Sequence, residues 1–426
     1  MSLIKGEAAI VPAAPSLRRA PDHELVFRQD ANFFYLTGLT EPDCVLVLLG
    51  SPKGLRSVLY IRERNPSEER WQGERLGVAR AKRRFRVDEV RNITELESTL
   101  PKLLSDSAVL HYPAGINPQI DELIWRLYRS LSGPRVVFPH TIRDLRLLTS
   151  EMRVVKDRHE IQTIRHVVDI TAHAILFIMR RLGEVTSELH GARMIEQHFS
   201  KLGASGASFP SIVAAGRNAT CLHHQPRLQP LWRRELVLID VGAEFRGYAG
   251  DITRTLPASG KFTSAQADLY DAVLSALKAG ISRARPESTL EIIHQAIVRE
   301  LVSGLLSLRI LKGNASDIIA SESYKKYYPH RSGHFLGLDV HDITPIQAAK
   351  SGTLVSGYQR LLVPGNVFTI EPGLYCDPKD DKISKHFRGV GIRLEEDVLI
   401  TSNGCEVLSA RMPVERSEIE AIMGEA

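Results

Sequence analysis

The segment LVLIDVGAEFRGYAGDITRT, residues 236–255, decides the fold of the second half of the chain. It indicates a buried strand, a short turn around residues 245–247 and a returning strand, so we predict a β-hairpin with Asp240 opposite Asp251. Like charges directly opposite each other on one face of a sheet are destabilising. At about 4 Å and an effective dielectric constant of about 20, their repulsion is roughly 4 kcal/mol. A hard cation between the carboxylates would remove this conflict, so the hairpin predicts a metal site.

A second pair of acidic residues lies further along the chain, in segments that are also strand-like and apolar. Glu371 lies in FTIEPGLY and Glu395 in GIRLEEDVL. Side chains alternate along a strand, so Arg393, Glu395 and Asp397 are expected on one face and Glu396 on the other. The two halves of this part of the chain therefore each contribute two carboxylates.

Three histidines lie between the two acidic pairs, in YYPHRSGHFLGLDVHD. His330, His334 and His341 fall within twelve residues, beside Gly333 and Gly337, where backbones can approach closely. Four carboxylates and one histidine form a hard, oxygen-rich donor set, which suits Mn²⁺ or a similar ion better than a structural zinc site. Two dications would balance the four carboxylates.

The composition is that of an ordinary soluble globular enzyme. The chain has 426 residues, 43% of them hydrophobic and 25% charged, which favours two domains. No apolar run approaches the roughly 18 residues of a transmembrane helix, and the N-terminal segment lacks the apolar stretch of a signal peptide. We therefore expect a cytoplasmic protein with no membrane partner. The four scattered cysteines are expected to be reduced and buried; they are Cys44, Cys221, Cys376 and Cys405.

The charge distribution gives no reason to expect a nucleic-acid partner. The formal net charge is +5, a mild excess that does not demand an anionic partner. The basic residues concentrate in RAKRRFRVDEVR, residues 80–91, where Phe85 and Val87 interrupt them. We interpret this run as the solvated face of an amphipathic element.

The first third of the chain predicts an α/β domain. Residues 24–143 mix helical stretches with short apolar runs, among them CVLVLLG, SVLYIRE, SAVLHYP and RVVFP (135–139). Residues 144–160 are strongly charged and precede a long helical stripe of apolar residues. We place the domain boundary near residue 150, with an N-terminal domain of residues 1–149 and a second domain of residues 150–426.

The second domain predicts an α+β fold, with helices grouped around antiparallel hairpins. Helix start signals occur at Thr186, at Thr263 with Gln266 and at Ser288 with Glu291. The last two pairs have the spacing of a capping box. The long stripe before them consists of Ile161, Ile164, Val168, Ile175 and Ile178.

Taken together, these motifs resemble those of a known family. D-(x)10-D, H-x-x-x-H-x-x-G-x-x-x-H-D, T-x-E-P-G-x-Y and G-x-R-x-E are similar to the pita-bread metallopeptidases, specifically the proline-specific branch with aminopeptidase P and prolidase. Residues 21–80 also resemble the N-terminal domain of aminopeptidase P, in VFRQDANFFYLTGLTEPDCVLVLL and RNPSEERWQGERLG. The resemblance implies a C-terminal pita-bread catalytic domain preceded by a smaller α/β domain.

The resemblance implies a dinuclear metal site with all its ligand positions intact. Asp251 and Glu395 would bridge the two ions, with Asp240 on one ion and His334 and Glu371 on the other. The ions would be Mn²⁺, with Co²⁺ and Zn²⁺ as alternatives.

The remaining site residues are implied by the same resemblance. His223 matches a histidine that contacts substrate, although His224 stands where related sequences often have Tyr. His341 matches the histidine that stabilises the tetrahedral intermediate. His330 and Arg393 would wall the proline pocket, and Tyr375 with Arg393 would support the carboxylates.

The implied reaction is hydrolysis of the peptide bond between an N-terminal residue and a following proline. Water acidified by both ions would attack the carbonyl, Glu371 would take its proton, and His341 with the metal would stabilise the oxyanion. A dedicated pocket is needed because proline lacks the backbone N–H that general peptidases bind. The expected partners are peptides with proline second and further copies of this chain, as a dimer or tetramer in which Trp71 completes a neighbour's site.

Three alternatives remain open. A prolidase, which cleaves only Xaa-Pro dipeptides, shares the metal ligands. A non-catalytic pita-bread binding protein is expected to have lost ligands, and none is lost here. Creatinase shares the fold but works without metal, so the complete ligand set counts against it.

Overall fold

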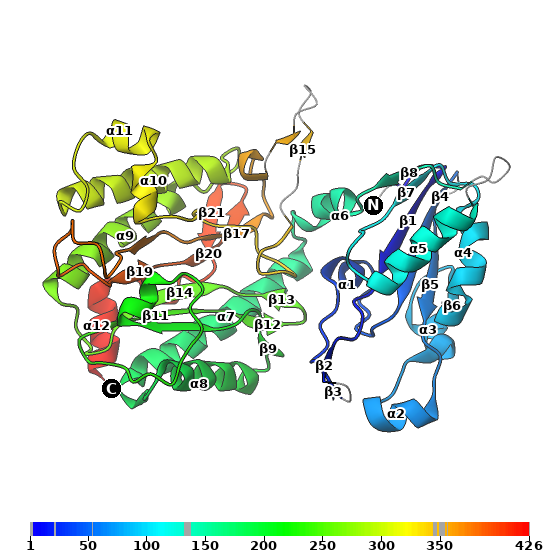
Figure 1. Ribbon diagram of the computed structural model, residues 1–426, viewed down its shortest axis with the longest axis horizontal. Helices are drawn as coiled ribbons and strands as arrows, with labels where there is room; N and C mark the ends of the chain where they lie inside the picture. The colour runs from blue at the N-terminus through cyan, green and yellow to red at the C-terminus, as the bar shows by residue number, and fades with distance from the viewer. Residues whose placement is uncertain are drawn as a thin grey trace. The chain divides into compact units, whose positions relative to one another are not determined.

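The computed structural model describes residues 3–20, 23–52, 54–131, 138–343, 347–348, 354–355 and 357–425. It divides into two compact units, Met1–Met152 and Arg153–Ala426. Figure 1 shows the elements of both units. Of the predicted strand-like run at 135–139, residues 135–137 lie outside the described residues.

The first unit is a six-stranded mixed sheet with helices on both faces. Ala9 and Val11 of the first strand pack into one hydrophobic cluster, and Ala8 and Ile10 into the cluster on the opposite face. A strand buried on both faces is apolar throughout, which explains its sequence. The sheet order is β6 (Glu89–Asn92), β5 (Gly54–Ile61), β4 (Val45–Ser51), β1 (Glu7–Pro12), β7 (Val109–His111) and β8 (Thr141–Arg143), beside a small hairpin of β2 (Arg18–Ala20) and β3 (His23–Glu24).

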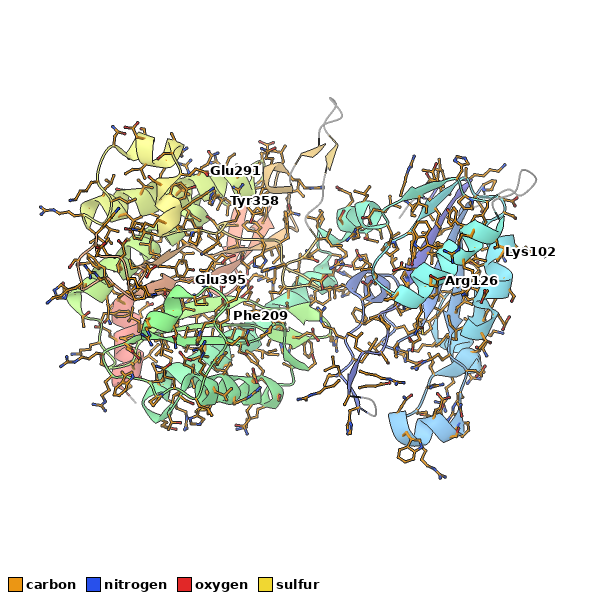
Figure 2. The ribbon with its side chains drawn as sticks, in the orientation of Figure 1. Lys102, Arg126, Phe209, Glu291, Tyr358 and Glu395 are labelled. Carbon is orange, nitrogen blue, oxygen red and sulfur yellow. The ribbon has the colours of Figure 1, made fainter. Side chains whose placement is uncertain are left out.

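Helices from both halves of this unit cover the sheet. Helices α1 and α3 contribute to one cluster, and α4 and α5 to the other. Lys102 of α4 and Arg126 of α5 are exposed on the outer side of these helices (Figure 2). The bounds are α1 (Ala31–Thr37), α2 (Pro66–Gln72), α3 (Gly77–Arg84), η1 (Ile93–Glu95), α4 (Leu96–Leu104), α5 (Pro118–Leu131) and α6 (Arg146–Arg153). The α/β prediction is confirmed.

The basic run at 80–91 forms the amphipathic element that its pattern predicts. In α3 the Ala81 side chain is buried, and Phe85 and Val87 pack against the adjacent cluster. The basic residues that follow Ala81 in the helix are exposed; they are Lys82, Arg83 and Arg84.

The second unit places short antiparallel sheets between helices. Helices α7 and α8 lie on one side of the strands, and α9 and α10 on the other (Figure 1). The helices are α7 (Arg158–Arg180), η2 (Leu182–Glu184), α8 (Glu188–Lys201), η3 (Gly216–Thr220), α9 (Ser264–Arg283), α10 (Leu290–Ser307), α11 (Ala315–Ala320), η4 (Ser323–Lys326), η5 (Gly357–Gln359) and α12 (Arg416–Gly424).

Within the described residues, the strands of this unit form five small groups. The two central sheets are β10 (Ile212–Ala215), β11 (Leu236–Val241) and β14 (Ile252–Pro257), and β17 (Val367–Ile370), β20 (Glu396–Thr401) and β21 (Gly404–Val407). Three groups extend them or lie beside them: β13 (Tyr248–Ala249), β12 (Ala243–Phe245) and β9 (Gly206–Ala207); β18 (Gly373–Tyr375) and β19 (Gly391–Arg393); and β15 (Gln347–Ala348) and β16 (Leu354–Val355). One isolated bridge joins Phe335 to Phe368.

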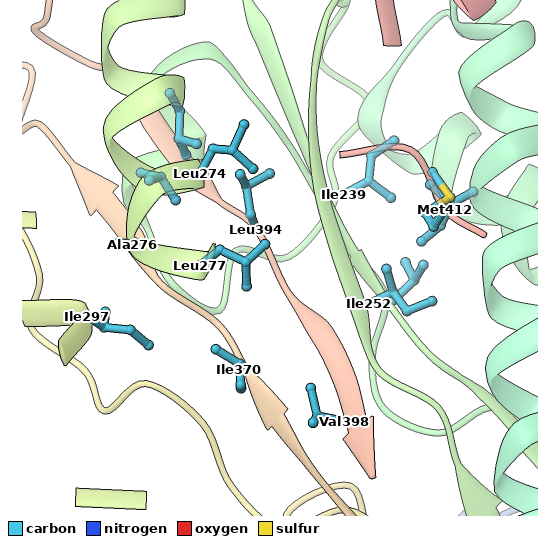
Figure 3. Packing of buried hydrophobic residues seen from close by; sticks show 14 of the residues in the cluster. Ile239, Ile252, Leu274, Ala276, Leu277, Ile297, Ile370, Leu394, Val398 and Met412 are labelled. Atoms are coloured by element: carbon cyan, nitrogen blue, oxygen red, sulfur yellow. The ribbon is translucent and has the colours of Figure 1, made fainter. Parts of the chain in front are cut away.

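One hydrophobic core holds these layers together. Leu277 of α9 and Ile297 of α10 face Ile370 of β17 and Val398 of β20 (Figure 3). A second part of the same core gathers around Ile239, Ile252 and Met412. The core therefore fixes the hairpins from both sides.

By length and composition alone, helix α7 could cross a membrane. Half of that window is buried inside the unit, and Ile164, Val168, Ile175 and Ile178 of the predicted stripe lie in the core. We therefore assign α7 as a core helix.

Two of the predicted helix starts are wrong by one residue. Thr263 caps α9 with a capping box to Gln266, as predicted. Helix α8 is capped by Ser187 instead of Thr186, and α10 by Thr289 instead of Ser288. In each case the capping residue has an extended backbone that lets its hydroxyl accept the N–H three residues on.

The described cysteines are all free thiols. Cys44 and Cys376 are buried and Cys405 is half-buried. The expectation that all four are buried is wrong for Cys221, which is exposed because it lies in the loop after η3, and is met only in part for Cys405.

Candidate metal centre and substrate cavity

The first hairpin brings its two aspartates together, but not in the predicted register. Asp240 lies opposite Thr253, not opposite Asp251. The prediction was wrong because the turn consists of two residues, Arg246 and Gly247, both at positive φ (52° and 82°). Such a turn suits the twist of a two-residue hairpin. Since Asp251 precedes Thr253 by two positions, it shares the face of Asp240 as its diagonal neighbour.

The second pair of carboxylates lies where a longer hairpin is interrupted. Thr369 pairs with Asp397 in one group, and Gly373 with Arg393 in the next, so the register is the same on both sides of the interruption. This register places Glu371 opposite Glu395. The interruption also frees their backbones: the Glu371 N–H donates to Ser332 O at 2.9 Å, and the Glu395 N–H to Thr253 O at 3.1 Å. The second bond ties the two hairpins together.

His334 reaches the carboxylates because the loop that carries it passes close to β17. A Cβ on Gly333 would lie 1.9 Å from Thr369 O, so only glycine fits there. The Thr369 N–H in turn donates to His334 O at 2.8 Å. His334 Nε2 lies 3.6 Å from Asp251 Oδ2 and 3.8 Å from Glu371 Oε1. One ligand atom each from Asp251, His334 and Glu395 lie within 4.8 Å of one another.

The carboxylates of this cluster cannot all be ionised without added positive charge. Burial, followed by the charge of Glu395, raises the pKa values of Asp251 and Glu371 well above their usual range. Burial and the charge of Asp240 raise the pKa of Glu395 to about 7. Among the described residues, Arg393 is the one cation hydrogen-bonded to any of the four carboxylates. Its Nη2 donates to Asp240 Oδ2 at 2.5 Å.

Two oxygens of the cluster are buried without a hydrogen-bond partner. They are Asp240 Oδ1 and Asp251 Oδ1. Buried carboxylate oxygens are normally paired, so each unpaired oxygen requires an explanation. Hard oxygen donors with no partner are what a divalent cation needs, so these residues fit a metal ion.

A cavity of about 680 Å³ opens beside the carboxylates. Phe209 and Tyr358, which both line it, lie on either side of Glu395 in Figure 2. Nine of the ten predicted site residues line this cavity: His223, Asp240, Asp251, His330, His334, His341, Glu371, Arg393 and Glu395.

The tenth residue, Tyr375, lies behind the cavity wall. Its hydroxyl bonds to His330 Nε2 at 2.9 Å and accepts from Arg393 Nη1 at 2.9 Å. Burial lowers the pKa values of His330 and His334 to about 4, and burial together with His223 lowers that of His341. All three imidazoles are therefore neutral near pH 7. The rings of His334 and His341 are 4.2 Å apart between centroids.

Two further residues support the carboxylates, and the sequence analysis assigned neither of them to the site. Thr253 Oγ1 donates to Glu395 Oε2 at 2.7 Å, and Asp397 Oδ2 accepts the Asp251 N–H at 3.0 Å. Strand alternation could have identified both residues, because Thr253 lies two residues after Asp251 and Asp397 lies two residues after Glu395.

Residues 162–402 match the family model for metallopeptidase family M24, and residues 1–111 match that for the aminopeptidase P N-terminal domain. The chain belongs to metallopeptidase family M24. It is 37% identical to the Xaa-Pro aminopeptidase of Escherichia coli K12, over 98% of this chain and 94% of that protein. It is 33% identical to human Xaa-Pro aminopeptidase 3, over 100% of this chain and 84% of that protein.

Solved structures of bacterial aminopeptidases share the fold over nearly the full chain. Aminopeptidase PepP of Pseudomonas aeruginosa superimposes with a TM-score of 0.91 at 37% identity, covering 99% of this chain and 95% of that one. Zinc-substituted E. coli aminopeptidase P in complex with product gives 0.91 at 36% identity with the same coverage. The predicted family, the pita-bread and α/β fold and the assignment as a metallopeptidase are confirmed.

Proposed function

We propose that the protein is a Xaa-Pro aminopeptidase, which hydrolyses the bond between an N-terminal residue and a following proline. The observation that carries this proposal is the cluster of four carboxylates and His334 beside a cavity walled by three further histidines. The relatives with this name extend over nearly the full chain and include the N-terminal domain. We propose residues 1–149 and 150–426 as the two functional domains.

The proposed cofactor is a pair of divalent cations, most simply Mn²⁺. With Arg393 included, the ionised cluster carries −4 + 1 = −3, and two dications bring it to +1. The unpaired oxygens of Asp240 and Asp251 support this assignment. The proposed ligands are Asp240, Asp251, His334, Glu371 and Glu395.

When bound, such ions acidify water and polarise the carbonyl of the scissile bond. Glu371 accepts the proton of the attacking water, a role that suits a carboxylate whose pKa is raised by burial and then by Glu395. His341 is a neutral imidazole at the cavity wall and can donate a hydrogen bond to the developing oxyanion. His223 lies on the exposed part of the cavity lining and contacts the substrate.

The proline pocket is proposed to lie against His330 and Arg393. The His330 ring is held at both nitrogens, by Arg331 O at 2.7 Å and by the Tyr375 hydroxyl. Arg393 is held by Tyr375 and Asp240. A wall fixed in this way can select a ring by shape without a hydrogen bond from the backbone N–H that proline lacks.

The proposed setting is a cytoplasmic homo-oligomer, a dimer or tetramer, that acts on peptides. Trp71 on α2 is 87% exposed, so its side chain is accessible to another molecule. Light scattering of the full chain tests the oligomeric state.

The decisive experiment compares Xaa-Pro dipeptides with Xaa-Pro-Xaa peptides in the presence of Mn²⁺. We expect release of the N-terminal residue from the longer peptides and no release when alanine replaces the proline. Activity restricted to dipeptides identifies a prolidase. Elemental analysis should find about two ions per chain, and protein that binds no metal would identify a non-catalytic binding protein.

A further inference from the structure

Two adjacent histidines face opposite ways in the loop that follows η3. His223 is exposed and lines the cavity, whereas His224 is only 4% exposed and faces the protein interior. The two side chains are chemically identical. The conformation of this loop alone therefore decides which imidazole meets the substrate.

The interior partner of His224 is Glu188, the first residue of α8. The Glu188 side chain is 1% exposed and lies 2.8 Å from His224 Nε2 through Oε2. Burial by itself raises the pKa of Glu188, but hydrogen bonds from Ala215, Asn218 and His224 outweigh it and leave the pKa lowered. The group is therefore a buried carboxylate anion.

This carboxylate holds the loop at four points along its length. Oε1 accepts the Ala215 N–H and the Asn218 side-chain amide, both at 2.8 Å. Oε2 accepts the Arg227 N–H at 3.1 Å in addition to its bond with His224. The chain from 215 to 227 thus folds around one carboxylate, and His223 is carried on the side away from it.

We propose that Glu188 is a positioning residue that fixes His223, and not His224, as the imidazole facing the substrate. The inference rests on the proposed peptidase function. It adds a determinant outside the cavity to the residues that line it.

Only a carboxylate satisfies this geometry. An amide offers one oxygen acceptor and one NH₂ donor. The His224 ring can change tautomer to meet that donor, but the backbone N–H of Ala215 or Arg227 cannot become an acceptor. Glu188→Gln therefore breaks the anchor on one side while keeping the shape of the side chain, which makes it the variant of choice.

The first test is a double-mutant cycle on hydrolysis of an Xaa-Pro-Xaa peptide. Glu188→Gln should lower kcat/KM about tenfold, which is the contribution of one hydrogen bond to a charged group. The loss should be divided between kcat and KM in the same proportion as in His223→Ala. In the His223→Ala background, Glu188→Gln should cause no further loss of kcat/KM. Equal losses in both backgrounds, or no loss at all, overturn the proposal.

The control and the wild type separate this proposal from the proposed function. Glu196→Gln removes a carboxylate of the same helix that pairs with Arg193 at the surface, and should behave as wild type. Wild type without Xaa-Pro-Xaa activity refutes the proposed function, and the second test then decides the positioning role alone.

The second test needs no activity. Diethyl pyrocarbonate modifies accessible neutral imidazoles, and mass spectrometry locates them. We expect His223 but not His224 to be modified in wild type, and His224 to become reactive in Glu188→Gln. His294, 7% exposed, should stay protected in both, so protection of His224 in the variant, or its exposure together with His294, overturns the proposal.

A matched pair at position 224 covers the case in which Glu188→Gln fails to fold. His224→Gln keeps an N–H donor near the position of Nε2, and His224→Met has similar length without a donor. We expect the Gln variant to retain most of its kcat/KM and the Met variant to lose about tenfold. Equal values for the two variants refute the role of the hydrogen bond to Glu188.

Discussion

In metal-free protein, Glu395→Gln should raise the stability of the fold at pH 8, although it removes a proposed metal ligand. Glu395 is buried, and its carboxyl faces the charge of Asp240. The amide keeps the acceptor that Thr253 Oγ1 needs, so the hydrogen bond at 2.7 Å is retained. What the substitution removes is the negative charge.

The size of the effect follows from the pKa of Glu395, which burial and Asp240 raise from 4.5 to about 7. A raised carboxyl pKa means that the folded state binds the proton more tightly than the unfolded state. The cost of ionisation is therefore absent below about pH 4.5 and fully present above about pH 7. At about 1.4 kcal/mol per unit it reaches about 3 kcal/mol at pH 8 and stays below about 1 kcal/mol at pH 5.

The assay is urea or thermal unfolding of chelator-treated protein at both pH values. A difference of about 3 kcal/mol corresponds to roughly 6–12 °C in Tm. Loss of the Glu395 charge also relieves Asp251 and Glu371, whose pKa values it raises, and this acts in the same direction. With excess Mn²⁺, wild type should be more stable than Glu395→Gln, because only wild type keeps Glu395 as a metal ligand. Glu196→Gln is the matched control. A metal-free variant that is no more stable than wild type at pH 8, or equally stabilised at pH 5, refutes the reasoning.

Three further substitutions probe the site and its support. Glu371→Gln should lower kcat by a factor of about 10² to 10⁴ with metal in excess, which is the usual contribution of a general base. A variant that binds metal and has a kcat near that of wild type contradicts the assignment of Glu371 as the base. His330→Ala should lower the ratio of kcat/KM for proline over alanine peptides at unchanged metal content, and an unchanged ratio removes it from the proline pocket. Arg153→Met should cost about 3 kcal/mol in urea unfolding because it takes one cation from the buried Asp342; a cost below about 1 kcal/mol would show that Lys156 suffices.

Strand alternation allowed part of the site to be predicted from the sequence. Arg393, Glu395 and Asp397 were expected on one face and Glu396 on the other. In the structure Glu396 points away from the cavity and pairs with Arg254 at 2.5 Å. This succeeded because the period of a strand is local and depends only on the backbone.

Features that depend on backbone torsions or on distant contacts could not be predicted. The register of the first hairpin depends on the positive φ of Arg246, which a residue other than glycine adopts uncommonly. The four bonds of Glu188 join residues 27 to 39 positions apart. No local pattern marks Glu188 as more than the first residue of a helix.

Two buried carboxylates of the second unit that lie away from the cavity have cation partners, which the carboxylates at the cavity largely lack. Asp342 is buried but has two cations, Arg153 and Lys156, and the buried Glu396 has Arg254. The four carboxylates at the cavity have only Arg393 among the described residues. Since a buried charge without a partner is costly, a fold selected for stability alone would not gather four here. The deficit of positive charge lies where the cavity opens. A cation bound there would neutralise the carboxylates at a position that a peptide in the cavity can reach.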